Sequence, residues 1–162
     1  MKIAITGHSA GIGQALAKIF EAQGHKIIGL SRRNGYNIRS LPKVASMIEP
    51  CDMFINNAQV GFAQTELFWE VWNRWKGQEK TIINISTQMT NNSIAPKEEW
   101  DQYIIQKKAL ELAHMQCQER SSLPKLILIT PGSIATQPGQ HLPEYQDVNE
   151  YARETVEYIN GQ

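Results

Sequence analysis

Tyr103 and Lys107 are the two residues of this chain whose types and spacing best fit proton transfer. They stand four apart in Lys97–Arg120, a segment with strong helical character, so we expect both side chains on one face of a helix. A free phenol has a pKa of about 10, and a neighbouring ammonium favours the phenolate. A hydroxyl from Ser86 or Thr87, at the end of a predicted strand, would hold a substrate carbonyl while the tyrosine moves the proton. Taken singly, the pair also fits an ordinary surface pair on a helix.

The first residues of the chain have the pattern of a phosphate-binding turn. Lys2–Thr6 reads as a short buried strand, Gly7, Gly11 and Gly13 follow, and Gln14–Gln23 continues as an amphipathic helix. The N-terminus of a helix offers unpaired N–H groups and a positive dipole end, and glycines let a pyrophosphate approach closely. By itself the glycine spacing is equally compatible with an ordinary strand–turn–helix.

The end of the second predicted strand carries positive charge. His25–Leu30 is followed by Ser31, Arg32 and Arg33, without an acidic residue. In a dinucleotide-binding fold an acid at this place binds the free ribose 2′-hydroxyl of NAD, whereas arginine accommodates a 2′-phosphate. The two arginines therefore predict NADP rather than NAD, the alternative being a pair of solvated surface arginines.

Short apolar runs alternate with helical segments, an order typical of a parallel sheet covered by helices on both faces. We therefore predict an α/β fold, a Rossmann-like doubly wound sheet of about six strands in the order 3-2-1-4-5-6, and a single domain over residues 1–162. In such sheets ligands bind beyond the carboxyl ends of the strands, where the candidate residues gather. The predicted strands are Lys2–Thr6, His25–Leu30, a residual Tyr36–Ile38, Cys51–Ile55, Thr81–Ile85 and Leu126–Thr130; the predicted helices are Gln14–Gln23, Leu41–Ile48, Leu67–Trp75, Lys97–Arg120 and Glu150–Ile159, with Ser133–Asn149 as a loop.

Leu67–Trp75 carries an aromatic stripe. Phe68, Val71, Trp72 and Trp75 share one helical face in this segment. Such a stripe forms either core or a contact between subunits.

Taken together, these motifs resemble the short-chain dehydrogenase/reductase family. Five motifs stand in the family's order: the Thr-Gly-x-x-x-Gly-x-Gly turn at 6–13, Asn-Asn-Ala-Gly at 56–59 with Gln59 in place of the last glycine, a hydroxyl-bearing strand at 82–87, Tyr-x-x-x-Lys at Tyr103 and Lys107, and Pro-Gly-x-Ile-x-Thr at 131–136. They cover nearly the whole chain.

The resemblance implies an NAD(P)-dependent oxidoreductase acting on a carbonyl or an alcohol. Tyr103 would be the general acid/base, Lys107 would bind the nicotinamide ribose and lower the tyrosine pKa, and Thr87 or Ser86 would orient the substrate. Asn37 would lie beside adenine. The implied cofactor-binding residues are Gly7, His8, Ser9, Gly11, Ile12, Gly13, Ser31, Arg32, Arg33, Asn37, Asn57, Ala58, Tyr103, Lys107, Pro131, Gly132, Ile134 and Thr136.

The chain also departs from the family's pattern. It is unusually short, with no room for the second helix between Arg33 and Ile38 and no seventh strand after a reduced substrate loop. The asparagine that joins the family's proton relay has no good match, Asn73 being a poor candidate.

Two hypotheses about function follow from these motifs and departures. The first is an NADP-dependent reductase of a small carbonyl, and the alternative is a non-catalytic dinucleotide-binding protein that serves as a sensor or scaffold.

Composition narrows the choice of partners. Sixteen basic and sixteen acidic residues cancel, which argues against a nucleic-acid or anionic-membrane partner. Cys51 and Cys117 lack zinc-ligand spacing, and His114 has no second ligand pair, so we expect no metal site and two reduced thiols. With no signal peptide or membrane span, we expect a cytoplasmic protein. In the family that the chain resembles, the fourth and fifth helices commonly pair between subunits. The resemblance therefore implies a homodimer, formed through the helices at 67–75 and 97–120.

Overall fold

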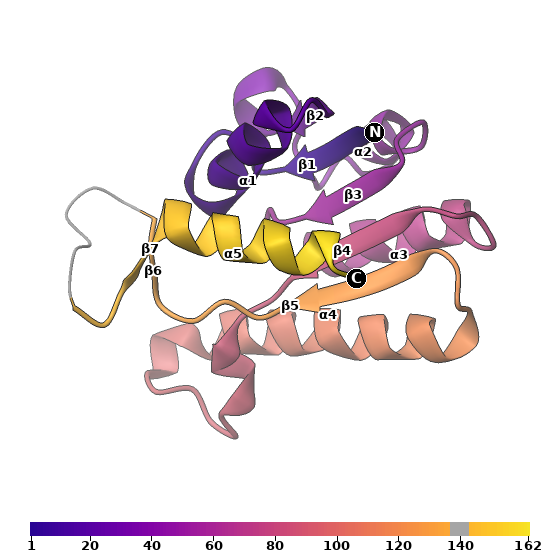
Figure 1. The fold of residues 1–162 in the computed structure, drawn as a ribbon. Coiled ribbons are helices and arrows are strands. Elements are labelled where there is room, and N and C mark those ends of the chain that lie inside the picture. The colour runs from indigo at the N-terminus through magenta and orange to yellow at the C-terminus, as the bar shows by residue number, and fades with distance from the viewer. Residues whose placement is uncertain (137–142) are drawn as a thin grey trace.

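The fold is built around a parallel sheet of five strands. The computed structural model describes residues 1–136 and 143–162, and in them the strands lie in the order β2-β1-β3-β4-β5. This doubly wound α/β sheet confirms the predicted fold class (Figure 1). The strands are β1 (Lys2–Thr6), β2 (Lys26–Leu30), β3 (Met53–Asn56), β4 (Thr81–Ile85) and β5 (Lys125–Ile129).

Helices cover both faces of the sheet. The helices α1 (Gly11–Ala22) and α5 (Val148–Asn160) pack together on one face. The helices α2 (Leu41–Ile48), α3 (Ala63–Trp75) and α4 (Asp101–Arg120) cover the other. Short 3₁₀ turns lie at η1 (Arg32–Asn34), η2 (Gln88–Asn91) and η3 (Glu98–Trp100). Polar side chains of α3 and α4 lie at the ends of β3 and β4: Gln64 of α3 bonds the Asn56 carbonyl, and Lys107 of α4 bonds the Ile85 carbonyl.

Two apolar cores result from the alternation of side chains along each strand. Ile3 and Ile5 of β1 point toward α1 and α5, while Ala4 between them points toward α2 and α3. Both faces are apolar, as a parallel sheet buried on both sides requires. The aromatic stripe of α3, including Trp72 and Trp75, is buried in the second of these cores. It therefore belongs to the core of its own chain and not to a contact between subunits.

The residual strand expected at Tyr36–Ile38 is absent, and β2 is the edge of the sheet. The backbone of this segment is occupied by turns, because the Tyr36 N–H donates to the Ser31 carbonyl at 2.8 Å. The Ser40 N–H likewise donates to the Asn37 carbonyl at 2.9 Å. Ile38 is buried and Tyr36 packs against the core, so their apolar character reflects packing rather than strand pairing.

The expected loop at Ser133–Asn149 also differs from the prediction. It contains a small parallel pair, β6 (Ile134–Ala135) with β7 (Gln146–Asp147), and α5 begins at Val148 rather than Glu150. The Asp147 carboxylate caps α5 by accepting from the backbone N–H groups of Asn149 and Glu150. Residues 137–142 of the predicted loop lie outside the described residues.

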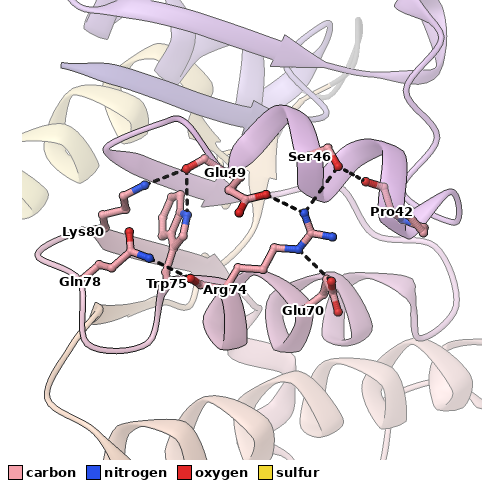
Figure 2. A network of polar contacts seen from close by, with 8 residues as sticks. All are labelled: Pro42, Ser46, Glu49, Glu70, Arg74, Trp75, Gln78 and Lys80. Atoms are coloured by element: carbon pink, nitrogen blue, oxygen red, sulfur yellow. Dashed lines mark hydrogen bonds and ion pairs between the residues drawn. The ribbon is translucent and has the colours of Figure 1, made fainter.

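A polar network fixes α2 against α3 (Figure 2). Arg74 of α3 bonds Glu49, which follows α2, and Glu70, both at 2.9 Å. The Glu49 carbonyl, one of the unpaired carbonyls at the end of α2, accepts from Trp75 Nε1 at 3.2 Å and from Lys80 Nζ at 2.7 Å. The network thereby sets the position of α3, whose first turn reaches the end of the sheet.

Candidate cofactor and active site

A chain of three cavities runs along the carboxyl ends of the strands. The arginine cavity, of about 450 Å³, contains Arg32 and Arg33, and the glycine cavity, of about 310 Å³, contains Gly11. The tyrosine cavity, of about 230 Å³, contains Tyr103. Neighbouring cavities share lining residues: Ala10 lines the first two, Asn57 lines the second and third, and Gln59 lines the first and third. The three cavities therefore adjoin one another, and together they form a trough.

The glycine turn between β1 and α1 forms the middle of this trough. Gly7 and Gly11 have positive φ angles of 69° and 55°, which L side chains rarely adopt. A Cβ on Gly13 would lie 2.3 Å from the Gly7 carbonyl oxygen, so close packing of the turn excludes a side chain there. The N-cap residue of α1 is Ala10, which makes no side-chain cap, and the first turn holds no acidic residue. The helix N–H groups are thus suited to a pyrophosphate.

The ends of β1 and β3 are joined below the turn. Thr6 Oγ1 accepts from the backbone N–H groups of Asn57 and Ala58 at 3.0 and 3.1 Å. The Asn57 side chain in turn donates to the Thr6 carbonyl at 3.1 Å. These bonds hold the turn and the Asn-Asn-Ala segment in one rigid unit.

Not every expected cofactor residue lies in the trough. The His8 imidazole packs on β2, where a Cβ on Gly29 would lie 2.3 Å from its ring, and His8 lines none of the three cavities. Ser9 lines the arginine cavity and Ile12 lines the other two. Gly29 was missed by sequence reasoning, because only the position of His8 reveals why this strand needs a glycine.

The arginine cavity carries three positive side chains. Arg39 joins Arg32 and Arg33 in its lining, and among the described residues no carboxylate lines this cavity. In the described residues the ion pairs involve Arg74 and Lys97, and none involves these three arginines. The Ser31 backbone N–H and hydroxyl donate to Asn34 Oδ1 at 2.8 and 3.3 Å, and these bonds fix η1, the turn that carries Arg32 and Arg33. Sequence reasoning missed Arg39, although it is the third arginine within eight residues.

Asn37 also lines the arginine cavity, where it was expected beside adenine. Its Oδ1 accepts from the Arg39 backbone N–H at 3.0 Å. This acceptor therefore stabilises the local turn and presents Arg39.

The two candidate hydroxyls after β4 have different partners. The Thr87 side chain shares a hydrogen bond with Tyr103, whereas Ser86 Oγ donates to Glu111 Oε1 at 2.5 Å. Thr90 Oγ1 donates to the same Glu111 oxygen at 2.8 Å. Thr87 is thus the hydroxyl placed at the tyrosine, and Ser86 fixes α4 through Glu111.

Lys107 is almost fully buried beneath Tyr103. It is 3% exposed, and its Nζ donates to the Gln64 Oε1 and to the Ile85 carbonyl, both at 2.9 Å. Burial lowers the pKa of Lys107 to about 8, and the charge of Glu111 opposes this decrease. The ammonium is held at the end of β4 by two uncharged oxygens.

Tyr103 differs from the expectation in its ionisation. Burial raises the pKa of Tyr103 above 10.0, with the Thr87 hydrogen bond acting in the opposite direction. The expected decrease caused by Lys107 is absent, because the ammonium faces Gln64 and Ile85 and lies 5.7 Å from the centre of the tyrosine ring. At neutral pH this phenol keeps its proton.

The segment 131–136 closes the trough over the glycine turn. Pro131, Gly132, Ile134 and Thr136 all line the tyrosine cavity, and Thr136 packs near Gly11, 3.4 Å from the place of a Cβ there. A Cβ on Gly132 would lie 2.9 Å from Gln88 Oε1. This predicted cofactor-binding segment is therefore brought to the same cavity as Tyr103.

Gln59, which stands where the family has glycine, spans the trough. Its Nε2 donates to Gln106 Oε1 on α4 at 2.5 Å. This bond joins the wall of the arginine cavity to the helix that carries the tyrosine and the lysine. The departure from the motif is visible in the sequence, but its partner 47 residues away is not.

Three other kinds of feature bear on function: a metal site, reactive cysteines and a membrane-spanning helix. In residues 1–136 and 143–162 no three His, Cys, Asp or Glu side chains lie close enough to hold a metal ion. Cys51 and Cys117 are buried and free, and burial raises the pKa of the Cys117 thiol to about 11. None of the helices in the same described part of the chain is both long and apolar enough to span a membrane.

Comparison with known proteins identifies the fold. No family model matches the chain. A curated relative, an uncharacterized oxidoreductase from Emericella nidulans, is 29% identical over 120 residues, and the match covers 59% of this chain and 43% of the relative. The chain thus matches less than half of that protein.

Solved structures match over almost the entire chain. A short-chain dehydrogenase from Burkholderia cenocepacia in complex with NADP superposes with a TM-score of 0.82 and 16% identity, covering 99% of this chain and 84% of that one. A 4-hydroxyisoleucine dehydrogenase complexed with NADH has a TM-score of 0.76 and 18% identity, covering 99% and 90%. The chain has the fold of the short-chain dehydrogenases, and the resemblance found in the sequence is confirmed at the level of the fold.

Proposed function

We propose that this chain is an NADP-dependent oxidoreductase that reduces a small carbonyl compound, or oxidises the corresponding alcohol, with Tyr103 as general acid/base. The observation that carries the proposal is the tyrosine cavity, which Tyr103, Thr87 and the buried Lys107 line together. This cavity adjoins the glycine turn through Asn57. Residues 1–162 would act as a single dinucleotide-binding domain in the cytoplasm.

The proposed roles follow from the contacts. When bound, the nicotinamide would supply the hydride. Thr87 would orient the carbonyl oxygen, and Tyr103, whose raised pKa keeps it protonated, would donate the proton to that oxygen. Lys107 has three N–H donors, of which Gln64 and Ile85 accept two, so one is left for the cofactor. Burial of this ammonium strengthens its bond to a ribose hydroxyl.

NADP is favoured over NAD by the charge of the arginine cavity. Arg32, Arg33 and Arg39 line it without a carboxylate, and guanidinium groups bind phosphate in a bidentate geometry. Structural neighbours occur with either cofactor, since one is in complex with NADP and another with NADH. The proposal of NADP rather than NAD therefore rests on the positive charge of the arginine cavity in this chain.

Titration with NADPH and NADH, followed by nicotinamide fluorescence, tests the choice of cofactor. We expect NADPH to bind more tightly, and we expect Arg32→Gln and Arg33→Gln each to weaken NADPH binding at least about tenfold, since a hydrogen bond to a charged group contributes about 1.5–3 kcal/mol. NADH affinity should not change. Arg153→Gln, an exposed arginine on α5, is the matched control. A preference for NADH would contradict the proposal.

The second candidate function, a dinucleotide-binding sensor or scaffold without turnover, is favoured by one observation. The chain has a reduced substrate loop compared with the family that it resembles, so less of it is left to enclose a substrate. A carbonyl screen with NADPH discriminates between the two functions, because binding without consumption of NADPH supports the second.

We also propose a homodimer, through exposed apolar side chains of α3 and α4. On α4, Ile105, Leu112 and Met115 are exposed along one side, and Trp69 is exposed on α3. We expect light scattering to give the mass of a dimer and Leu112→Glu to shift it toward the monomer. Tyr158→Glu, at an exposed site on α5, should leave the mass unchanged. A monomeric wild type would overturn this part of the proposal.

A further inference from the structure

Gln64, in the first turn of α3, is the most completely bonded polar side chain near the tyrosine cavity. It is 2% exposed, and its Nε2 donates to the Asn56 carbonyl at 2.8 Å and to the Ile85 carbonyl at 3.0 Å. Two carbonyl oxygens can face only the NH₂ end of the amide, so the orientation of the side chain is determined. Its Oε1 must then face Lys107, from which it accepts at 2.9 Å.

Sequence reasoning missed this contact between Gln64 and Lys107. The relay asparagine of the family had no match, and Gln64 was not among the candidates because it belongs to no motif. Gln64 lies in the first turn of α3, and the packing of α3 brings this turn to the end of β4. Arg74 and Trp75 fix the other end of the helix. The result is a neutral acceptor directly beneath the ammonium.

We propose that Gln64 is a positioning residue for the proposed reaction, holding the Lys107 ammonium together with the Ile85 carbonyl so that the third N–H of Lys107 remains for the bound cofactor. The inference rests on the proposed function. Without Gln64, a buried ammonium would keep a single acceptor and lose both its fixed position and part of its stabilisation.

The surroundings of Lys107 make this contact measurable. Among the described residues, the charge that acts on the ammonium is that of Glu111, one turn further along α4, while α3 and β4 face it with the uncharged Gln64 and Ile85. Tyr103 and His114 complete the titratable groups of α4 nearby, and burial lowers the pKa of His114. Because burial brings the pKa of Lys107 to about 8, a change of one acceptor moves it within an accessible pH range.

The sign of the change follows from the charge. The folded pKa of Lys107 is depressed, so the ammonium is present below about pH 8 and is lost above it. Gln64→Glu places a carboxylate against the ammonium and is expected to raise the pKa by about 1 to 3. Gln64→Met removes the acceptor at nearly the same volume and is expected to lower it. A purely structural role for Gln64 predicts no such opposite pair of shifts.

The experiment is an NMR titration of the lysine side chains in the unliganded protein, with Lys107→Met to assign the signal. Asn84→Asp is the matched control, because it makes the same amide-to-acid change in a buried side chain that bonds Asn56 and His114 but not Lys107. It should leave the Lys107 titration in place. The same variants are then compared in kcat/KM against pH, where the alkaline limb should move as the titration does.

The possible outcomes separate the inference from the proposed function. Opposite shifts of the Lys107 pKa in Gln64→Glu and Gln64→Met, together with a higher KM for NADPH in Gln64→Met, support the positioning role of Gln64. Titrations that equal the wild type in both variants overturn it, even if NADPH binding and turnover are normal. A wild type that binds neither dinucleotide rejects the proposed function and with it the cofactor role, whereas unchanged titrations alone leave that function intact. If Gln64→Met fails to fold, Gln64→Glu decides by its shift.

Discussion

Tyr103→Phe is expected to lower kcat by about 10²–10⁴-fold with little change in NADPH affinity. The phenol, which α4 places in the tyrosine cavity, is the proposed proton donor, and phenylalanine keeps the ring while it removes the hydroxyl. The proposed contacts of Lys107 with the cofactor and of Thr87 with the carbonyl remain in this variant, so we expect binding to be retained. The measurement is single-turnover oxidation of NADPH with the best carbonyl from the screen, together with the NADPH titration.

Tyr151→Phe provides the control for this prediction. Tyr151 of α5 is also buried enough that its pKa is raised, and its hydroxyl also bonds a threonine, Thr155. It lines a cavity of about 260 Å³ beside β5 that shares no lining residue with the tyrosine cavity. Loss of a hydroxyl from such a pair has the same structural consequence in both places. Equal rates in wild type and Tyr103→Phe would therefore reject Tyr103 as the acid.

The sheet could be predicted because each of its strands is a short apolar run bounded by turn residues. The run Thr81–Ile85 carries isoleucines on both of its faces, which is typical of a central strand in a parallel sheet. The strand predicted at Tyr36–Ile38 was wrong because the same apolar residues also fit a turn that buries Ile38 against the sheet. What decided between them was the turn bonding of Tyr36 and Ser40, which is a tertiary property and not a local preference.

The candidate site was predictable only where chemistry and motif coincide. Tyr103, Lys107 and the glycine turn are encoded at short spacings, and the structure places them along one trough. Gln64 and Gln106 act through partners 43 and 47 residues distant, and no spacing rule reveals them. The raised pKa of Tyr103 was missed for the same reason, because it depends on burial and on which oxygens hold the lysine.

Gly13→Ala is expected to have the second large effect, on both stability and cofactor binding. Gly13 lies in α1 and has no positive φ angle, so an added methyl group meets no intrinsic backbone strain. The obstacle is the Gly7 carbonyl oxygen at 2.3 Å and Asn57 Nδ2 at 2.7 Å from the new Cβ. Backbone cannot move aside as a flexible side chain does, so we expect a cost of about 3 kcal/mol, at the upper end for overpacking.

This cost would appear in binding as well as in folding, because the turn that must shift is the one proposed to hold the pyrophosphate. A shift of 3 kcal/mol corresponds to about a hundredfold in an equilibrium constant. Denaturant unfolding and NADPH titration measure the two parts separately. Gly161→Ala is the control, since a Cβ there meets its nearest atom at 3.5 Å, an ordinary contact. If Gly13→Ala binds NADPH as the wild type does, the glycine turn is not the phosphate site, whatever its effect on stability.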